Sequence, residues 1–198
     1  MLRGFRQRDQ AMIGIIITVV VVVIVLILIF VAIGQFNKLR RLDQLCIGSF
    51  ADIETLLTKR ADLIPNLVET VKGARDFESG TLEAVTKART DAMQAKTMDA
   101  TSQADGALTA ALGRLFAVAE AYPQLTATAN FQDLQAQLAQ VESQLQFSRQ
   151  FYNDTTVTLN TALRTIPSMW FAGMAKVTQR PAYAEPDEAR RSAPKVEF

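Results

Sequence analysis

The stretch "FQDLQAQLAQVESQLQFSRQFYNDTTVTLNTALRTI", residues 131–166, places mostly apolar side chains at alternating steps of three and four residues. Such a repeat lies on one face of an α-helix. Its length indicates a coiled-coil-like seam, with partner helices that cross at about 20°. Pro167 is expected to end the helix. The seam residues are Phe131, Leu134, Leu138, Val141, Leu145, Ser148, Tyr152, Thr155, Leu159, Ala162 and Ile166.

Three segments before this stretch share the helical spacing. Residues 35–59 contain no proline or turn cluster, residues 62–95 follow with apolar side chains on one face, and residues 107–122 end at Pro123. The small, polar segment 95–106 is expected to connect two helices. No β-branched run with period-two alternation occurs, so the sequence predicts an all-α fold with four long helices. The seam of the first helix consists of Leu39, Leu42, Cys46, Ser49, Ile53 and Leu56.

Pro65 lies inside an otherwise helical pattern. An interior proline costs a helix about 3 kcal/mol, whereas a proline in the first turn costs almost nothing. Asp62 is a good N-cap residue, and counting from it places Pro65 in the first turn. Pro65 therefore marks either the start of a new helix or a bend in a helix that continues from the preceding segment.

Residues 11–34, "AMIGIIITVVVVVIVLILIFVAIG", contain no charge and are long enough to cross a hydrocarbon layer of about 30 Å. We interpret them as a transmembrane anchor, because the apolar region of a cleaved signal peptide is usually about 7–15 residues. The first helix is expected to continue directly out of this span. Three arginines precede the span and Lys38, Arg40 and Arg41 follow it, so the positive-inside rule leaves the orientation open.

Residues 168–198 divide into an aromatic, apolar part and a part rich in Pro, Ala and charge. Trp170 and Phe171, in the first part, dock on the helices, contact lipid headgroups or bind a partner; docking is the preferred interpretation. The second part has the composition of a disordered tail. The expected organisation is a short N-terminal tail (1–10), the anchor (11–34), a helical domain (35–175) and a C-terminal tail (176–198).

The composition offers little catalytic chemistry. The chain has no histidine, and Cys46 is its only cysteine, so a disulfide within the chain and a cysteine-based zinc site are excluded. Acidic side chains such as Glu54 and Asp62 are expected on solvated faces, with Lys59 or Arg60 as partners. Lys plus Arg (21) nearly equals Asp plus Glu (20), so nucleic acid is not an expected partner. No catalytic residue, cofactor or metal site is expected.

Several motifs, in order, resemble the LemA family: "KRADLIPNLVETVKG" at 59–73, "LFAVAEAYPQL" at 115–125, "FYND" at 151–154, "RTIP" at 164–167 and "APKVEF" at 193–198. The resemblance implies one N-terminal span and an antiparallel helical bundle at the bacterial cytoplasmic membrane, but no agreed biochemical activity. The sequence departs from the family pattern in two places, at Ala74, Arg75 and Phe77 and around residues 174–177. A structural role is expected for the motif residues Asp62, Pro65, Asn66, Tyr122, Pro123, Tyr152, Asn153 and Pro167.

The anchor, the missing catalytic groups and the long seam together favour a non-catalytic membrane scaffold. Its expected partners are the lipid bilayer and further copies of the chain, because confinement to a membrane raises the effective concentration. The alternative is an adaptor or regulatory subunit that binds another membrane protein through the helical surface or the Trp170 region. A hydrolase that uses a carboxylate and a borrowed metal has no positive support in the sequence.

Overall fold

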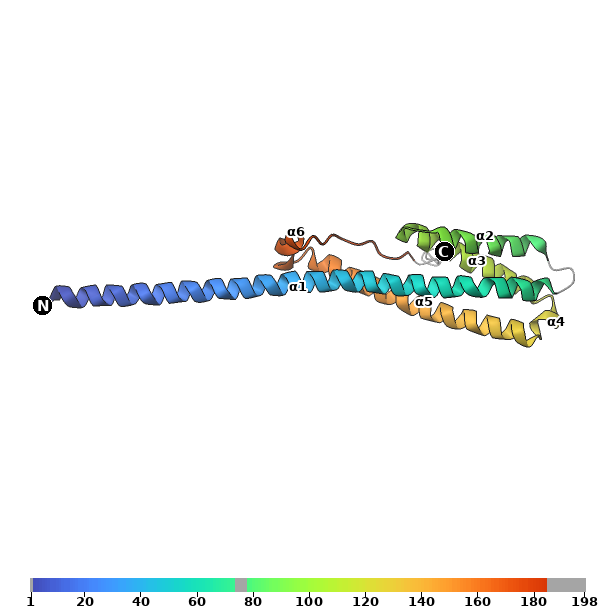
Figure 1. Cartoon of the computed structure of the whole chain (residues 1–198), viewed down its shortest axis with the longest axis horizontal. Coiled ribbons are helices and arrows are strands. Elements are labelled where there is room, and N and C mark those ends of the chain that lie inside the picture. Colours follow the sequence, from blue (N-terminus) through green and yellow to red (C-terminus); the bar gives the residue numbers. More distant parts are fainter. Residues whose placement is uncertain (1, 74–77, 185–198) are drawn as a thin grey trace, which may run out of the picture. The chain divides into compact units, whose positions relative to one another are not determined.

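The computed structural model describes residues 2–73 and 78–184 of the chain, with side chains from residue 14 onward. These residues contain helices and no strand, which confirms the all-α prediction. The antiparallel four-helix order stays a prediction. The elements are α1 (Leu2–Lys72), α2 (Ser79–Gln94), α3 (Met98–Ala119), α4 (Pro123–Thr126), α5 (Ala129–Ala162), the 3-10 helix η1 (Ser168–Phe171) and α6 (Ala172–Ala175) (Figure 1).

Two compact units divide the chain. Unit 1 comprises Met1–Gln44 and Thr158–Arg180, and unit 2 comprises Leu45–Val157 and Pro181–Phe198. Residues 185–198, which belong to the predicted C-terminal tail, lie outside the described residues. Within the described residues, each unit has its own buried side chains and is considered separately below.

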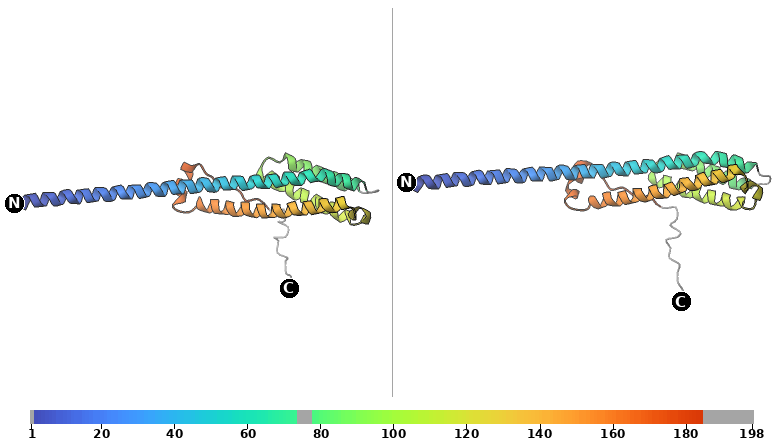
Figure 2. Two further views of the ribbon diagram at one scale, coloured as in Figure 1. Left: turned by 60° about the horizontal axis from the view of Figure 1, so that its bottom comes forward. Right: turned by 90° about the horizontal axis from the view of Figure 1, so that it is seen from below.

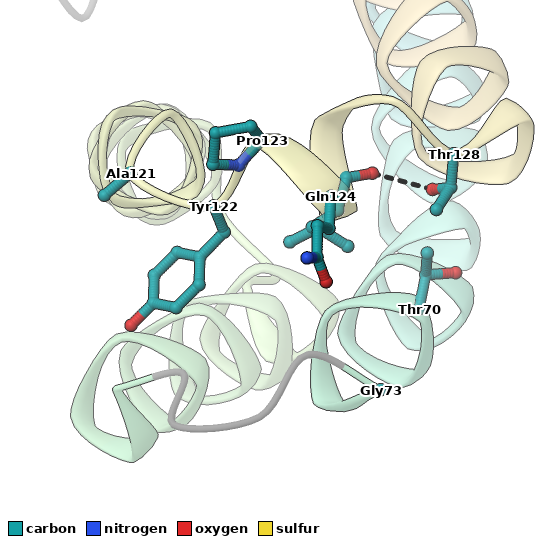
Figure 3. Close-up of a pocket in the computed structure, with 8 residues that line it drawn as sticks. Thr70, Gly73, Ala121, Tyr122, Pro123, Gln124 and Thr128 are labelled. Atoms are coloured by element: carbon teal, nitrogen blue, oxygen red, sulfur yellow. Dashed lines mark hydrogen bonds between the residues drawn. The ribbon is translucent and has the colours of Figure 1, made fainter.

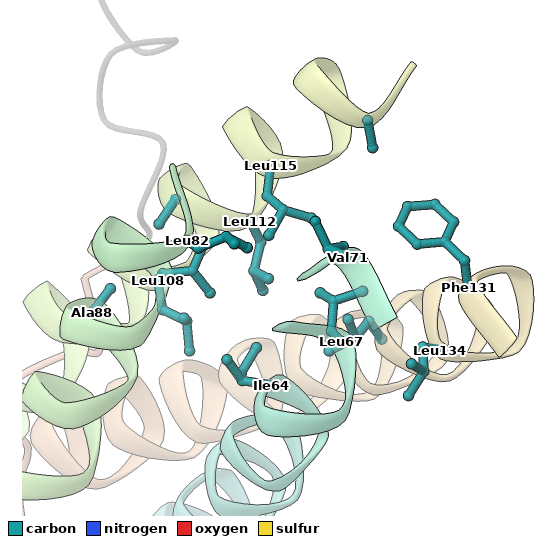
Figure 4. Packing of buried hydrophobic residues seen from close by; sticks show 14 of the residues in the cluster. Ile64, Leu67, Val71, Leu82, Ala88, Leu108, Leu112, Leu115, Phe131 and Leu134 are labelled. Atoms are coloured by element: carbon teal, nitrogen blue, oxygen red, sulfur yellow. The ribbon is translucent and has the colours of Figure 1, made fainter. Parts of the chain in front are cut away.

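In unit 2, one apolar cluster joins α1, α2, α3 and α5 (Figure 4). Full burial of an aliphatic or aromatic side chain stabilises the fold by about 1.5–3 kcal/mol, so this cluster is the main source of cohesion in the unit. Phe116 and Phe131 add an edge-to-face contact, with ring centroids 6.0 Å apart. Central members of the cluster are Ile64, Leu67, Val71, Val85, Leu108, Leu112, Leu115, Phe131 and Leu138.

The predicted seam of α5 is buried over most of its length, with Ser148 half-buried. The helix ends at Ala162, however, and Ile166 is 66% exposed. The last turn is tightened by a bond from the amide of Arg164 to the carbonyl of Thr161. The prediction that the helix continues to Ile166 is therefore wrong, in keeping with the preference of a residue before proline for extended backbone.

Pro65 lies inside α1, which runs without a break from Leu2 to Lys72. The prediction of a new helix capped by Asp62 is wrong, and the alternative of one continuing helix is correct. Proline removes the amide that would bond to the carbonyl four residues earlier, at Ala61. That oxygen instead accepts a 2.8 Å hydrogen bond from Nε of Arg89 in α2. A side chain from another helix thus satisfies the group that Pro65 leaves without a helical partner.

Two predicted boundaries between helices are also wrong. The segment predicted as one helix over residues 62–95 is divided, because α1 ends at Lys72 and α2 begins at Ser79. The predicted connection at 95–106 shrinks to three residues, because α3 begins at Met98. Thr97 caps it through a 3.2 Å bond from the amide of Ala100 to the threonine hydroxyl. The first turns of α3 bury polar side chains, which hid the helical period.

In unit 1, α1 changes from an exposed to a packed helix. The large apolar side chains of residues 15–33 are 43–75% exposed, and among the described residues α1 alone is long and apolar enough to cross a membrane. Beyond Gln35, side chains such as Leu39 and Leu42 are buried. Residues 163–180 fold back beside this part of α1 (Figure 2). The helix therefore continues directly out of the apolar segment, as predicted.

Residues 176–184 are held in place at Val177, Arg180 and Tyr183, in contrast to the predicted tail. In unit 1, Val177 is 5% exposed, and Arg180 forms an ion pair with Asp43 at 2.7 Å. The side-chain amide of Asn160 also donates to the carbonyl of Arg180 and accepts from its main-chain amide. In unit 2, Tyr183 is 2% exposed. The Pro- and Ala-rich composition suggested disorder because it does not reveal these specific polar partners.

Candidate functional site

Asp105 of α3 lies at the centre of a buried group of charged side chains in unit 2. Its Oδ1 accepts a hydrogen bond from Nη1 of Arg60 in α1 at 3.1 Å. Its Oδ2 accepts one from Nη2 of Arg149 in α5 at 2.6 Å. All three residues are at most 5% exposed. Because a buried carboxylate is tolerated only when it is paired, Asp105 fixes three helices to one another at a single point.

Glu142 of α5 completes the group on its more solvated side, with 38% of its side chain exposed. Its Oε1 accepts from Nη1 of Arg149 at 3.1 Å, and its Oε2 lies 2.9 Å from Nη1 of Arg60. Within the described part of the chain, Nε of Arg60 and Nε of Arg149 have no hydrogen-bond partner. Two guanidinium groups thus face two carboxylates, and the formal charges cancel.

Tyr183 joins the C-terminal segment to this group. Its hydroxyl donates to Oδ2 of Asp105 at 2.9 Å, and Cζ of Arg149 lies 5.8 Å from the centroid of its ring. The side-chain amide of Asn153 accepts from the main-chain amide of Tyr183 at 2.8 Å and donates to its carbonyl at 3.2 Å. Tyr152 adds a 3.0 Å bond to the carbonyl of Pro181. The side chains of two adjacent residues of α5 therefore bind the main chain of the segment at Pro181 and Tyr183.

The surroundings keep these groups in one protonation state. Burial and the carboxylate of Asp105 raise the pKa of the Tyr183 hydroxyl well above its ordinary value of about 10. Burial opposes the charge on Arg149, but the attraction of Asp105 and Glu142 outweighs it and raises the pKa of that guanidinium. Tyr183 is therefore a neutral donor and Arg149 a cation at neutral pH, so neither is suited to act as a general base.

We call Arg60, Asp105, Glu142, Arg149 and Tyr183 the Asp105 cluster. Its role is structural, because its hydrogen bonds and ion pairs hold α1, α3, α5 and the C-terminal segment of unit 2 in one arrangement. We refer to this set of contacts as the latch. Removal of one partner from such a buried group strands the opposite charge and typically destabilises a protein by about 3–5 kcal/mol. Among the described residues, no group of three or more Cys, Asp or Glu side chains is arranged to hold a metal ion.

The cluster was not predicted, although the sequence contains a signal for it. Arg60, Asp105 and Arg149 occupy core positions of their helices: Arg149, for example, lies four residues after Leu145 and three before Tyr152. Opposite charges at core positions of different helices indicate a buried pair. The expectation that Arg60 pairs with acidic neighbours on a solvated face is wrong, because its partner is 45 positions away.

The predicted motif residues fall into separate places. Tyr152 and Asn153 hold the C-terminal segment, as described above. Tyr122 and Pro123 line a pocket of about 570 Å³ in unit 2, together with Thr70 and Gly73 (Figure 3). The other motif residues, Asp62, Pro65 and Asn66, are exposed on α1, and Pro167 is half-buried before η1.

Trp170 and Phe171 behave differently from each other. Phe171 is half-buried, but Trp170 is 67% exposed, so the prediction that Trp170 docks on the helices is wrong. Cys46 is fully buried on α1, as expected for a small apolar residue at a seam position.

The LemA family model matches residues 49–198, which include the whole Asp105 cluster. The chain belongs to the LemA family. No curated protein matches the chain. The match begins beyond the apolar segment of α1, so LemA membership rests on the helices and the C-terminal segment alone.

Proposed function

We propose that this LemA-family chain is a non-catalytic scaffold, anchored by one span in the bacterial cytoplasmic membrane, which associates with copies of itself. The observation that carries the proposal is α1. Its large apolar side chains at 15–33 are 43–75% exposed, and the same helix continues without a break into the packed residues of unit 1. In lipid, this exposed apolar surface is stable because a helix satisfies its own backbone groups.

Unit 2 offers a surface for self-association. A groove of about 500 Å³ lies between α1 and α5, and Leu56 and Phe147 are among the residues that line it. Phe147 is 72% exposed and Phe151, one turn further along α5, is 43% exposed. Two neighbouring exposed phenyl rings are unfavourable in water and suit a contact that buries them. Chains held in one membrane meet at high effective concentration, so even a weak contact of this kind is populated.

The absence of catalysis in the proposal has a physical basis in the Asp105 cluster. Asp105 is paired with the two buried arginines and with the Tyr183 hydroxyl, and Tyr183 and Arg149 stay protonated at neutral pH. Such a group supports a rigid surface rather than a proton transfer.

The alternative is an adaptor that uses the same groove for a helix of another membrane protein. The exposed rings of Phe147 and Phe151 favour this reading equally, because a helix-in-groove contact buries the same area. The two functions differ in what occupies the groove: a second copy or a foreign helix.

The first test is the mass of the full chain in lipid nanodiscs. The scaffold predicts species that are multiples of 21.8 kDa, the mass of one chain. The double variant Phe147→Ser, Phe151→Ser should shift these species toward the monomer. The matched control is Val157→Ser, which removes a 61% exposed apolar side chain from the same helix and should leave the mass unchanged.

A strict monomer at all concentrations contradicts the scaffold. Capture from native membranes then decides the alternative: a stoichiometric foreign membrane protein, lost in the double variant, supports the adaptor. Release of the full chain from membranes by alkaline wash contradicts the anchor in both cases.

A further inference from the structure

Unit 1 carries four exposed, large apolar side chains within one short segment outside the candidate span. Ile166 is 66% exposed, Met169 44%, Trp170 67% and Met174 70%. We call these four residues the Trp170 patch. They come from the segment 166–175, which contains η1 and α6 and has no charged residue. Grouped exposure of large apolar side chains marks a surface that meets an apolar partner.

The segment is tied to α1 at the end of the apolar span. The hydroxyl of Ser168 donates a 2.7 Å hydrogen bond to Oε1 of Gln35, and Ser168 is 3% exposed. Gln35 is the first polar side chain after residues 11–34. Trp170 is two residues from Ser168, so this bond places the patch at the level where α1 changes from apolar to polar.

The turn after α6 reverses the chain, so that Val177 is buried directly after it. Lys176 adopts a left-handed conformation with φ of 52°, and the amides of Lys176 and Val177 bond to the carbonyls of Gly173 and Ala172. This is the Schellman pattern that ends a helix and reverses the chain. Val177 is buried directly after the turn, whereas Lys176 and Met174 point outward.

Cationic side chains lie on either side of the segment in sequence and shortly after Gln35 on α1. Arg164 and Lys176 flank the segment, and Lys38, Arg40 and Arg41 follow Gln35 on α1, all exposed. Membrane proteins concentrate tryptophan at the boundary between headgroups and acyl chains, and long cationic side chains reach from there to the phosphates. The exposed apolar side chains, their position beside the end of the apolar span and the nearby cationic side chains therefore all suit the headgroup boundary of a membrane.

We propose that segment 166–175 is an interfacial wedge, which inserts the Trp170 patch into the headgroup–acyl boundary of the bilayer that holds α1. The wedge rests on the anchoring stated in the proposed function. The occupant is lipid because the patch is fixed beside the apolar span, so the same bilayer that surrounds residues 15–33 reaches it. A wedge of this kind, with a patch at a depth of about 5–10 Å, fixes the rotation and tilt of α1.

Trp170 is the only tryptophan of the chain, so its fluorescence reports on the wedge without further labelling. The full chain is placed in nanodiscs made with phospholipids whose acyl chains carry bromine at a shallow or at a deep position. We expect a blue-shifted emission and a loss of most of the intensity, larger with shallow than with deep bromine. Soluble acrylamide should quench the emission weakly.

Two variants separate the wedge from the anchor, both built on Trp170→Phe. Val21→Trp places the reporter in the apolar segment, where bromine should quench it, most strongly at the deep position. Met93→Trp places it at a 56% exposed position of α2 in unit 2, which does not line the groove between α1 and α5, so acrylamide should quench it.

Quenching of Trp170 by shallow bromine supports the wedge. An unquenched Trp170 beside a quenched Val21→Trp reporter overturns the wedge and leaves the anchor standing. A blue-shifted Trp170 that neither bromine nor acrylamide quenches also overturns it, because protein then covers the patch. If neither Trp170 nor the Val21→Trp reporter is quenched by bromine, both the wedge and the anchor fail.

Discussion

Arg89 Nε donates a 2.8 Å hydrogen bond to the carbonyl oxygen of Ala61, the acceptor that Pro65 deprives of its helical donor. Ala61 is 2% exposed, so water cannot easily take the place of the arginine. The two residues lie 28 positions apart, on α1 and α2. This bond explains how a proline is accommodated inside a long helix, and it joins the two helices at the same point.

The first prediction concerns this bond. Arg89→Met keeps an unbranched side chain out to about the position of Nε but removes the donor. It should lower the free energy of unfolding by about 1–3 kcal/mol, because a buried carbonyl loses its partner. Denaturant unfolding of the full chain in mild detergent measures the change. In a Pro65→Ala background the same change should cost less, since the restored amide can bond to Ala61.

Arg114→Met is the control for this prediction. Arg114 is an exposed arginine on α3, so its replacement should change the stability by no more than about 0.5 kcal/mol. Equal effects of Arg89→Met with and without Pro65 would show that the arginine acts through packing rather than through the carbonyl of Ala61.

The second prediction concerns the centre of the Asp105 cluster. Asp105→Asn leaves Arg60 and Arg149 buried with one carboxylate instead of two, and should lower the free energy of unfolding by about 3–5 kcal/mol. Asp62→Asn is the matched control, because Asp62 is exposed on α1 and the same change should be nearly neutral. A similar small loss in both variants would contradict the latch.

The fold was predictable from sequence where burial coincides with apolar spacing. Leu39, Cys46 and Ile53 follow the helical period and are fully buried as expected. Apolar spacing does not reveal a helix where its core positions are polar. Thr101, Ser102 and Asp105 form the buried face of early α3, and their polarity made a helix look like a connection.

The candidate site was harder to predict because its contacts are long-range. The motif "FYND" points to Asn153, but nothing in the sequence shows that its partner is the main chain of Tyr183, 30 residues later. Likewise, proline at position 65 predicts an unpaired carbonyl, yet only the packing of α2 on α1 reveals Arg89 as the donor.

The third prediction follows from the raised pKa of Tyr183. A hydroxyl whose pKa is higher in the folded chain stabilises the fold fully below the ordinary pKa of about 10. That contribution is lost as the pH rises above 10 toward the folded value. Alkaline titration of tyrosinate absorbance should therefore show one of the three tyrosines ionising later than expected, and Tyr183→Phe should abolish this late step. Persistence of the step in Tyr183→Phe would assign it to another tyrosine.

The last prediction concerns the hold of α5 on the C-terminal segment. Asn153→Leu removes both the acceptor for the amide of Tyr183 and the donor to its carbonyl, while the Tyr183 hydroxyl keeps Asp105 as its partner. We expect the amide of Tyr183 to exchange its hydrogen faster and the late tyrosine of the alkaline titration to ionise earlier, because the segment opens more often. Gln150→Leu, at an exposed position one turn earlier on α5, should change neither readout. Faster exchange at Tyr183 without an earlier ionisation would mean that the hydroxyl stays latched to Asp105 while its main chain is free, and the two contacts would then be independent rather than one device.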